Sequence, residues 1–152
     1  MRNPIRWVPA FLFAGAALLC ITCVPRTAEQ PGQADSDGVV IHVSTGAEDP
    51  HRVLMALKMA DVMSADHDVL MYFDIRGVNV LTADSPDLFR TPFESSHSLI
   101  PKLLRAGVRI YACPTCLQVA EKSPADLMPG IEVANKDAFF DFTEGRILSL
   151  DY

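Results

Sequence analysis

Positive charge is scarce in this sequence of 152 residues, which has 13 lysines and arginines against 19 aspartates and glutamates and a formal net charge of −6. Two of the basic residues, Arg2 and Arg6, fall at the very start of the chain, so the remainder is still more acidic. An acidic surface repels the phosphate backbone of nucleic acids, and no basic, aromatic-studded stripe opposes that repulsion. The composition therefore argues against nucleic-acid binding.

Several motifs of enzyme sites are also missing. The sequence has no phosphate loop, no Ser-His-Asp order and no defensible pair of catalytic carboxylates. It has four cysteines, two of which, Cys20 and Cys23, lie in an apolar N-terminal run. We therefore expect no cofactor and no resident metal.

The first 24 residues differ from the rest of the chain. Arg2 and Arg6 precede an apolar run from Trp7 to Val24, which is the pattern of an export signal. The run is also long enough to span a bilayer. We predict a signal peptide or membrane anchor over 1–24 and export to the periplasmic side of a bacterial inner membrane. Lipidation at Cys23 is favoured, while a retained anchor and simple cleavage stay open.

Residues 25–37 are rich in proline, glycine, glutamine, serine and acid, without a periodic apolar pattern. This composition predicts a flexible linker. The folded domain is expected over 38–152.

Within the domain, short β-branched runs alternate with amphipathic segments. Strands are expected at 38–44, 69–73, 108–112, 131–134 and 146–150, and helices at 50–62, 98–105, 113–122 and 136–142. Only the stretch from Gly77 to Glu94 lacks a regular pattern. The alternation predicts an α/β fold, a three-layer α/β/α sandwich with a mostly parallel sheet of about five strands.

Local signals support two of the expected helix ends. Asp49 is a good N-cap and Pro50 suits the first helical position. Gly107 is expected to close the second helix in a left-handed conformation. Val62 is expected on the buried face of the first helix.

The strongest chemical signal is Cys113-Pro114-Thr115-Cys116, which follows a predicted strand and opens a predicted helix. The carboxyl ends of parallel strands are where α/β sheets place their sites. Unpaired N–H groups at a helix start lower the pKa of a thiol there, and a second cysteine can resolve a disulfide or persulfide formed on the first. Thiol or sulfur chemistry with Cys113 as nucleophile is favoured, and a structural disulfide or metal binding stays open.

Six residues are candidates for binding a substrate: Pro114 and Thr115, between the two cysteines, and four residues near the first strand and helix, Thr45, Gly46, His51 and Arg52. Thr45 and Gly46 close the first strand and could line the same crevice as the cysteines. His51 and Arg52 begin the first helix and could hold an anion or polarise sulfur, although solvated side chains are common there. His42, inside an apolar strand, is expected to be a packed or edge residue rather than a ligand.

The domain as a whole resembles the DsrE/DsrF-like, or YchN-like, family of sulfur-relay proteins. The resemblance rests on three blocks, 43–52, 68–73 and 103–117, and extends over nearly all of 38–152. It implies a parallel α/β fold, homo-oligomers, and a persulfide-carrying cysteine at the position of Cys113. Cys116 matches only those members that have the paired form of the motif.

These observations lead to one functional expectation and one alternative. We expect thiol-based sulfur handling by an exported or membrane-tethered protein, acting with a sulfur donor or acceptor protein or a small thiol. Classical enzyme turnover is left open. The alternative is an oligomeric binding or scaffold protein without catalysis, in which Cys113 and Cys116 form a structural disulfide.

Overall fold

A computed structural model describes residues 37–152 of the chain. The predicted leader over 1–24, the lipidation at Cys23 and nearly all of the predicted linker lie outside the described residues. Within the described part, no helix is both long and apolar enough to cross a membrane.

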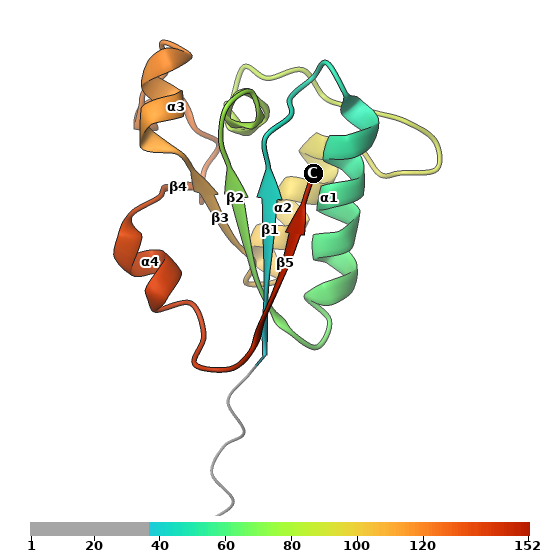
Figure 1. Ribbon diagram of the computed structural model, residues 1–152. Helices are drawn as coiled ribbons and strands as arrows, with labels where there is room; N and C mark the ends of the chain where they lie inside the picture. The colour runs from blue at the N-terminus through green and yellow to red at the C-terminus, as the bar shows by residue number, and fades with distance from the viewer. Residues whose placement is uncertain (1–36) are drawn as a thin grey trace, which may run out of the picture. The chain divides into compact units, whose positions relative to one another are not determined.

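The domain is built on a sheet of five parallel strands (Figure 1). In chain order these are β1 (Gly38–Val43), β2 (Asp68–Phe73), β3 (Arg109–Ala112), β4 (Glu132–Val133) and β5 (Ile147–Asp151). Their order across the sheet is β4-β3-β2-β1-β5. Because all strands run the same way, their carboxyl ends meet at one edge of the sheet, where α/β folds form crevices.

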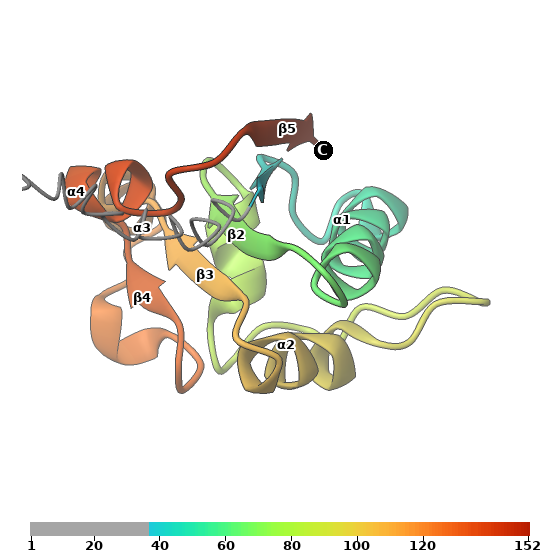
Figure 2. The ribbon, with the colours of Figure 1, turned by 90° about the horizontal axis from the view of Figure 1, so that it is seen from below.

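Helices cover both faces of the sheet, as Figures 1 and 2 show. Between residues 37 and 152 the α-helices are α1 (Pro50–Met63), α2 (Ser96–Arg105), α3 (Pro114–Val119) and α4 (Lys136–Phe140), and the 3-10 turns are η1 (Gly77–Leu81) and η2 (Pro124–Asp126). Helices α1 and α2 pack side by side against one face. Helix α4 lies over the other, and α3 starts where β3 ends. The predicted three-layer α/β fold is confirmed.

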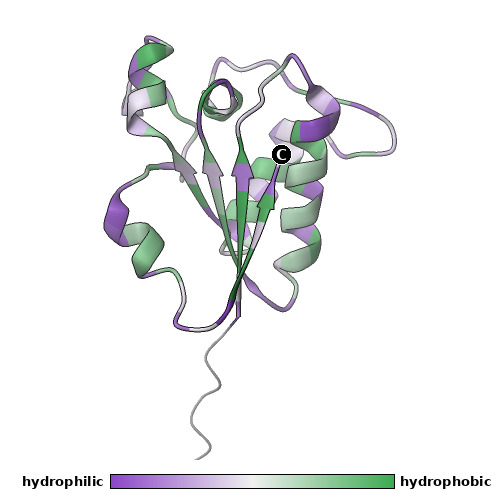
Figure 3. Cartoon of the chain, viewed as in Figure 1, coloured by the Kyte–Doolittle hydropathy of each residue, from purple (hydrophilic) through white to green (hydrophobic). Residues whose placement is uncertain are grey.

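The main core lies between the sheet and the helices α1 and α2. Alternate residues of the central strands, such as Ile41, Met71 and Ile110, point into it and are at most 2% exposed. Figure 3 shows the resulting hydrophobic colouring along the strands. On the opposite face a smaller cluster of Leu70, Tyr111 and Phe142 is buried under α4. This second face is thinly covered, and it holds several polar side chains discussed below.

The two predicted helix caps agree with the structure. Asp49 caps α1 by accepting a hydrogen bond from the backbone N–H of Arg52 at 3.2 Å, and Pro50 is the first helical residue. Gly107 follows α2 with a φ of +87°, and a side chain is disfavoured at such an angle.

Several details of the predicted elements were wrong. The fourth strand is Glu132–Val133 rather than 131–134, and α4 ends at Phe140 rather than at residue 142. Val62 is 51% exposed, because two residues beyond the buried Ala60 the helix has turned by about 200°. Helix α3 ends at Val119, three residues before the expected end, and α2 starts at Ser96 rather than at residue 98.

Candidate functional site

The two cysteines sit at the carboxyl edge of the sheet. The N–H of Cys113 donates to the carbonyl oxygen of Phe73 at 2.8 Å, which extends the pairing of β3 with β2 by one residue. Cys113 is then the N-cap of α3, and its Sγ accepts a hydrogen bond from the N–H of Cys116 at 3.5 Å. Both thiols are free and partly buried. The predicted position of the motif, at a strand–helix junction, is confirmed.

A tyrosine supplies a second hydrogen bond to the same sulfur. The hydroxyl of Tyr72, on β2, lies close to the side chain of Cys113, and hydrogen bonding between them lowers the pKa of the thiol. The Tyr72 ring meets Phe139 of α4 edge-on, with ring centroids 5.1 Å apart and an interplanar angle of 82°. Burial of the hydroxyl, together with its bond to Cys113, raises the pKa of Tyr72. The tyrosine therefore stays neutral and can donate its proton in a hydrogen bond to a thiolate.

The electrostatics separate the two thiols. Partial burial pushes the pKa of Cys113 upward, but the hydrogen bonds from Tyr72 and Cys116 outweigh it, so the pKa is lowered overall. Burial raises the pKa of Cys116, and the neighbouring Cys113 and Asp74 raise it further. Cys113 thus loses its proton first and is the stronger candidate for the nucleophile.

A histidine and two carboxylates lie next to Tyr72 on the thinly covered face. Nδ1 of His42 is 2.8 Å from Oδ1 of Asp151, and Nε2 is 3.0 Å from Oδ1 of Asp74. The His42 ring stacks on Tyr72, with centroids 5.8 Å apart and planes inclined by 23°. The expectation that His42 is a packed or edge residue missed these contacts. A signal was present, since Asp74 follows one strand and Asp151 ends another.

A shallow, mostly apolar groove of about 410 Å³ opens beside Cys116. It is lined by Ile75, Arg76, Asn79, Cys116, Val119 and Ala120. Ile75 is 61% exposed and has a φ of +44°, which is rare for a β-branched residue. Its backbone N–H is hydrogen-bonded to the side chain of Cys116. The groove gives a reacting molecule access to the Cys116 side of the motif.

The predicted residues Thr45 and Gly46 lie at the carboxyl end of β1, at the same edge of the sheet as the motif. Both are held by Glu48, whose Oε1 accepts hydrogen bonds from the Thr45 hydroxyl at 3.1 Å and the Gly46 N–H at 3.0 Å. A Cβ at Gly46 would lie 2.6 Å from the carbonyl oxygen of Arg76, a groove residue. The turn therefore supports the loop that lines the groove.

The other predicted binding residues make contacts elsewhere. His51 and Arg52 are exposed in the first turn of α1. The ring of His51 lies 5.5 Å from that of Phe93, and Arg52 is 3.5 Å from Asp49. The structure places neither residue against the thiols, and their part in substrate binding stays a prediction. The other two, Pro114 and Thr115, form the first turn of α3.

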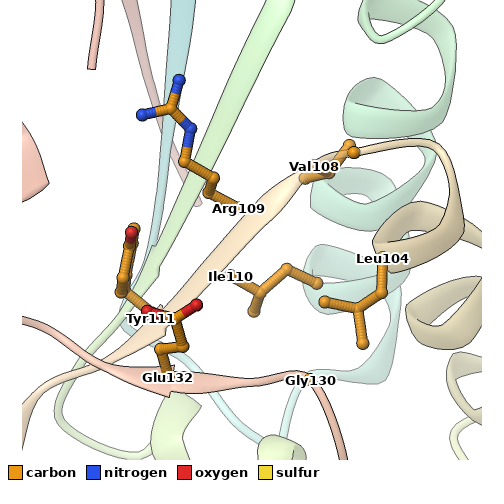
Figure 4. A pocket seen from close by; sticks show the side chains of 8 residues that line it. Leu104, Val108, Arg109, Ile110, Tyr111, Gly130 and Glu132 are labelled. Atoms are coloured by element: carbon orange, nitrogen blue, oxygen red, sulfur yellow. The ribbon is translucent and has the colours of Figure 1, made fainter. Parts of the chain in front are cut away.

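Another hollow, of about 200 Å³, lies beside β3 and is shown in Figure 4. Its lining side chains include Leu104 and Ile110, which face each other, and Arg109 and Glu132. None of the residues lining it is a cysteine or a histidine. Within residues 37–152, no group of three or more His, Cys, Asp or Glu side chains is arranged to hold a metal ion.

Comparisons with known proteins place the fold. No family model matches the chain, and no curated protein does. Solved structures that are similar to the chain include the protein of unknown function MTH1491 from Methanobacterium thermoautotrophicum and the YchN protein from E. coli. MTH1491 is 22% identical to this chain with a TM-score of 0.57, and the alignment covers 74% of this chain and 97% of the MTH1491 chain. The second is 14% identical with a TM-score of 0.63, covering 76% and 99%. The chain therefore has the DsrE/YchN-like fold, which the resemblance of its sequence to that family predicts.

Proposed function

We propose that the protein handles sulfur through Cys113, as a persulfide carrier or thiol redox protein assisted by Cys116. The observation that supports this most is the set of hydrogen bonds at Cys113. The Sγ of Cys113 accepts a hydrogen bond from the Cys116 N–H and interacts with the Tyr72 hydroxyl. Together these lower the pKa of the thiol, although its partial burial acts to raise it. A buried structural thiol would lack such donors and would be inert.

The first chemical step is sulfur uptake. The thiolate of Cys113 attacks the outer sulfur of a persulfide or polysulfide donor. The donor's S–S bond breaks, a new S–S bond forms at Cys113, and the donor leaves as a thiolate or hydrosulfide that takes up a proton from solvent. No net oxidation occurs, because the sulfane sulfur changes partners without a change in electron count.

Two fates are open to the persulfide. An acceptor thiolate can remove the outer sulfur and regenerate Cys113. Alternatively, Cys116 attacks the Sγ of Cys113, which forms a disulfide, oxidises the two cysteines and releases the outer sulfur as hydrosulfide. The second route is short-range, because Cys116 lies one helical turn from Cys113 and its N–H is 3.5 Å from the Sγ of Cys113.

The setting of this chemistry follows from the expectations drawn from the sequence. The proposal includes export to the periplasmic side of a bacterial membrane, a sulfur donor or acceptor that is a protein or a small thiol, and assembly into homo-oligomers. The groove beside Cys116 supports the part of the proposal that concerns a sulfur donor or acceptor, because it leaves room for such a molecule next to the cysteines.

Mass spectrometry of the full-length chain tests the proposal. After reduction, the chain is exposed to polysulfide and digested, and the peptide that contains Cys113 is weighed. We expect Cys113 to gain sulfur, and to keep it longest in Cys116→Ser, where no second thiol in the peptide can release it; Cys113→Ser should gain none at residue 113. Absence of added sulfur on Cys113 in Cys116→Ser would overturn the proposal.

The reduction potential separates this function from that of a scaffold with a structural disulfide. A potential below about −300 mV fits a structural bridge, and a higher potential fits a labile, reactive pair. The folded full-length chain is equilibrated in thiol–disulfide buffers, then quenched and digested, and the peptide with Cys113 and Cys116 gives the oxidised fraction. We expect the higher value.

A further inference from the structure

We propose that His42 is a positioning residue for Cys113: as an imidazolium it neutralises Asp74 and Asp151 beside Tyr72, and so favours the thiolate of Cys113. The inference rests on the thiolate chemistry of the proposed function. It assigns a role to a group that touches neither sulfur.

The contacts of the ring favour its protonated form. Both ring nitrogens face carboxylate oxygens, at 2.8 Å in Asp151 and 3.0 Å in Asp74. A neutral imidazole has one N–H and one lone pair, whereas the imidazolium has two N–H groups. In the neutral form one carboxylate would therefore face a lone pair.

The partial burial of the cluster strengthens this argument. Nε2 of His42 and Oδ1 of Asp74 are shut off from solvent, and neither makes a well-aligned hydrogen bond within the described residues. At 3.0 Å they form a close ion pair only when the ring is protonated. Burial lowers the pKa of His42, but the two carboxylates outweigh it and raise the pKa overall.

The cluster reaches the thiols through one carboxylate and one tyrosine. The charge of Asp74 raises the pKa of both Tyr72 and Cys116, although burial is the larger cause in each case. Tyr72 in turn stacks on His42 and is hydrogen-bonded to Cys113. A positive charge on His42 offsets the negative charge of Asp74, which makes a second negative charge at Cys113 less costly.

The titratable groups around His42 come from three sides. Strand β2 and its end present Tyr72 and Asp74, and β5 presents Asp151. From the β3–α3 junction the titratable groups that act on Tyr72 are the two cysteines, which raise its pKa. Helix α4 contributes Phe139, which has no charge and meets the Tyr72 ring edge-on.

The coupling is reciprocal. If protonation of His42 favours the thiolate, then the thiolate favours protonation of His42. As the pH rises through the pKa of His42, the histidine loses its charge and Cys113 becomes harder to deprotonate. The rate of thiolate reaction should therefore rise less steeply with pH than a single titrating thiol allows.

The test is the pH dependence of Cys113 alkylation in the full-length chain. Iodoacetamide labels the reduced protein, and fragmentation of the peptide that carries both cysteines in the mass spectrometer locates the label, which gives the rate at Cys113 alone. His42→Gln keeps a polar side chain but cannot become charged. We expect alkylation at neutral pH to slow by about fivefold, the lower end of typical coupling between sites. We also expect the pH profile to become that of a single group.

Two further variants control the result. His67→Gln removes a histidine that also pairs with a carboxylate, Asp66, at 2.7 Å, but lies just before the amino end of β2; it should leave the profile unchanged. Asp151→Asn alters a side chain that is 75% exposed, so the fold should tolerate it. It should move the histidine-dependent part of the profile to lower pH.

The inference is overturned if His42→Gln and Asp151→Asn both keep the wild-type pH profile, or if His67→Gln changes it as much as they do. This outcome is distinct from failure of the proposed function. Alkylation reports the thiolate, whereas persulfide formation is measured with polysulfide.

Discussion

Removing the Tyr72 hydroxyl should make Cys113 less reactive. Tyr72→Phe keeps the ring, its stacking on His42 and its edge contact with Phe139, and deletes the hydrogen bond to Cys113. A hydrogen bond to a charged group contributes about 1.5–3 kcal/mol. Because the site is partly open to water, the loss should be near the lower end, and about 1.4 kcal/mol corresponds to a tenfold change.

The assay is the rate of Cys113 alkylation at neutral pH, followed on the Cys113 peptide. We expect the rate in Tyr72→Phe to fall by about tenfold. At alkaline pH, where the thiol is ionised in both proteins, the rates should converge. A difference that disappears in this way identifies the thiolate fraction, rather than access to the sulfur, as the property that changed.

Tyr111→Phe is the matched control. Tyr111 lies on the same face of the sheet, in register with Tyr72, and also contacts Phe139. No described contact joins it to Cys113, so its loss of a hydroxyl should leave alkylation unchanged. Equal rates for Tyr72→Phe and the wild type at neutral pH would refute the idea that the tyrosine holds the thiolate.

Three other changes have expected outcomes. Cys116→Ser should lengthen the life of a persulfide on Cys113, measured by mass spectrometry over time, and equally fast loss would contradict a resolving role for Cys116. Gly77→Ala should lower the free energy of unfolding by at least about 2 kcal/mol in urea, because its Cβ would lie 2.3 Å from the carbonyl oxygen of Val43. Wild-type stability would show that this close approach relaxes freely. Ile75→Asn should raise the free energy of unfolding by about 1 kcal/mol, since asparagine tolerates the positive φ better, and a clear loss would contradict the strain.

The sequence predicts the order and kind of the elements well, because most strands are short apolar runs and the longer helices carry apolar residues at helical spacing. Asp49 and Gly107 mark helix ends through local chemistry that needs no tertiary context. The order of the strands could not be read in this way. It depends on which faces pack together, and β4, with two residues, carries almost no periodic signal of its own.

The site could be predicted only where it is local in sequence. The cysteine pair is visible because both residues lie within one strand–helix junction. His42, Asp74 and Asp151 belong to three segments, and 109 residues separate the first from the last. They meet because β1 lies between β2 and β5 in the sheet. The residue pattern within each strand does not show which strands are neighbours in the sheet. Tyr72 was missed for a related reason, since apolar burial alone accounts for a tyrosine within a strand.

The position of β5, next to β1 in the sheet, has a consequence for the folding of an incomplete chain. β1 is an inner strand only because β5 pairs with it along five residues, Gly38 to His42 against Ile147 to Asp151. Until β5 arrives, the run Gly-Val-Val-Ile-His-Val presents an open edge with strong β-propensity and little charge, which is the kind of segment that seeds aggregation. A chain truncated before residue 147 should therefore be lost to insoluble material rather than accumulate as a soluble, inactive domain.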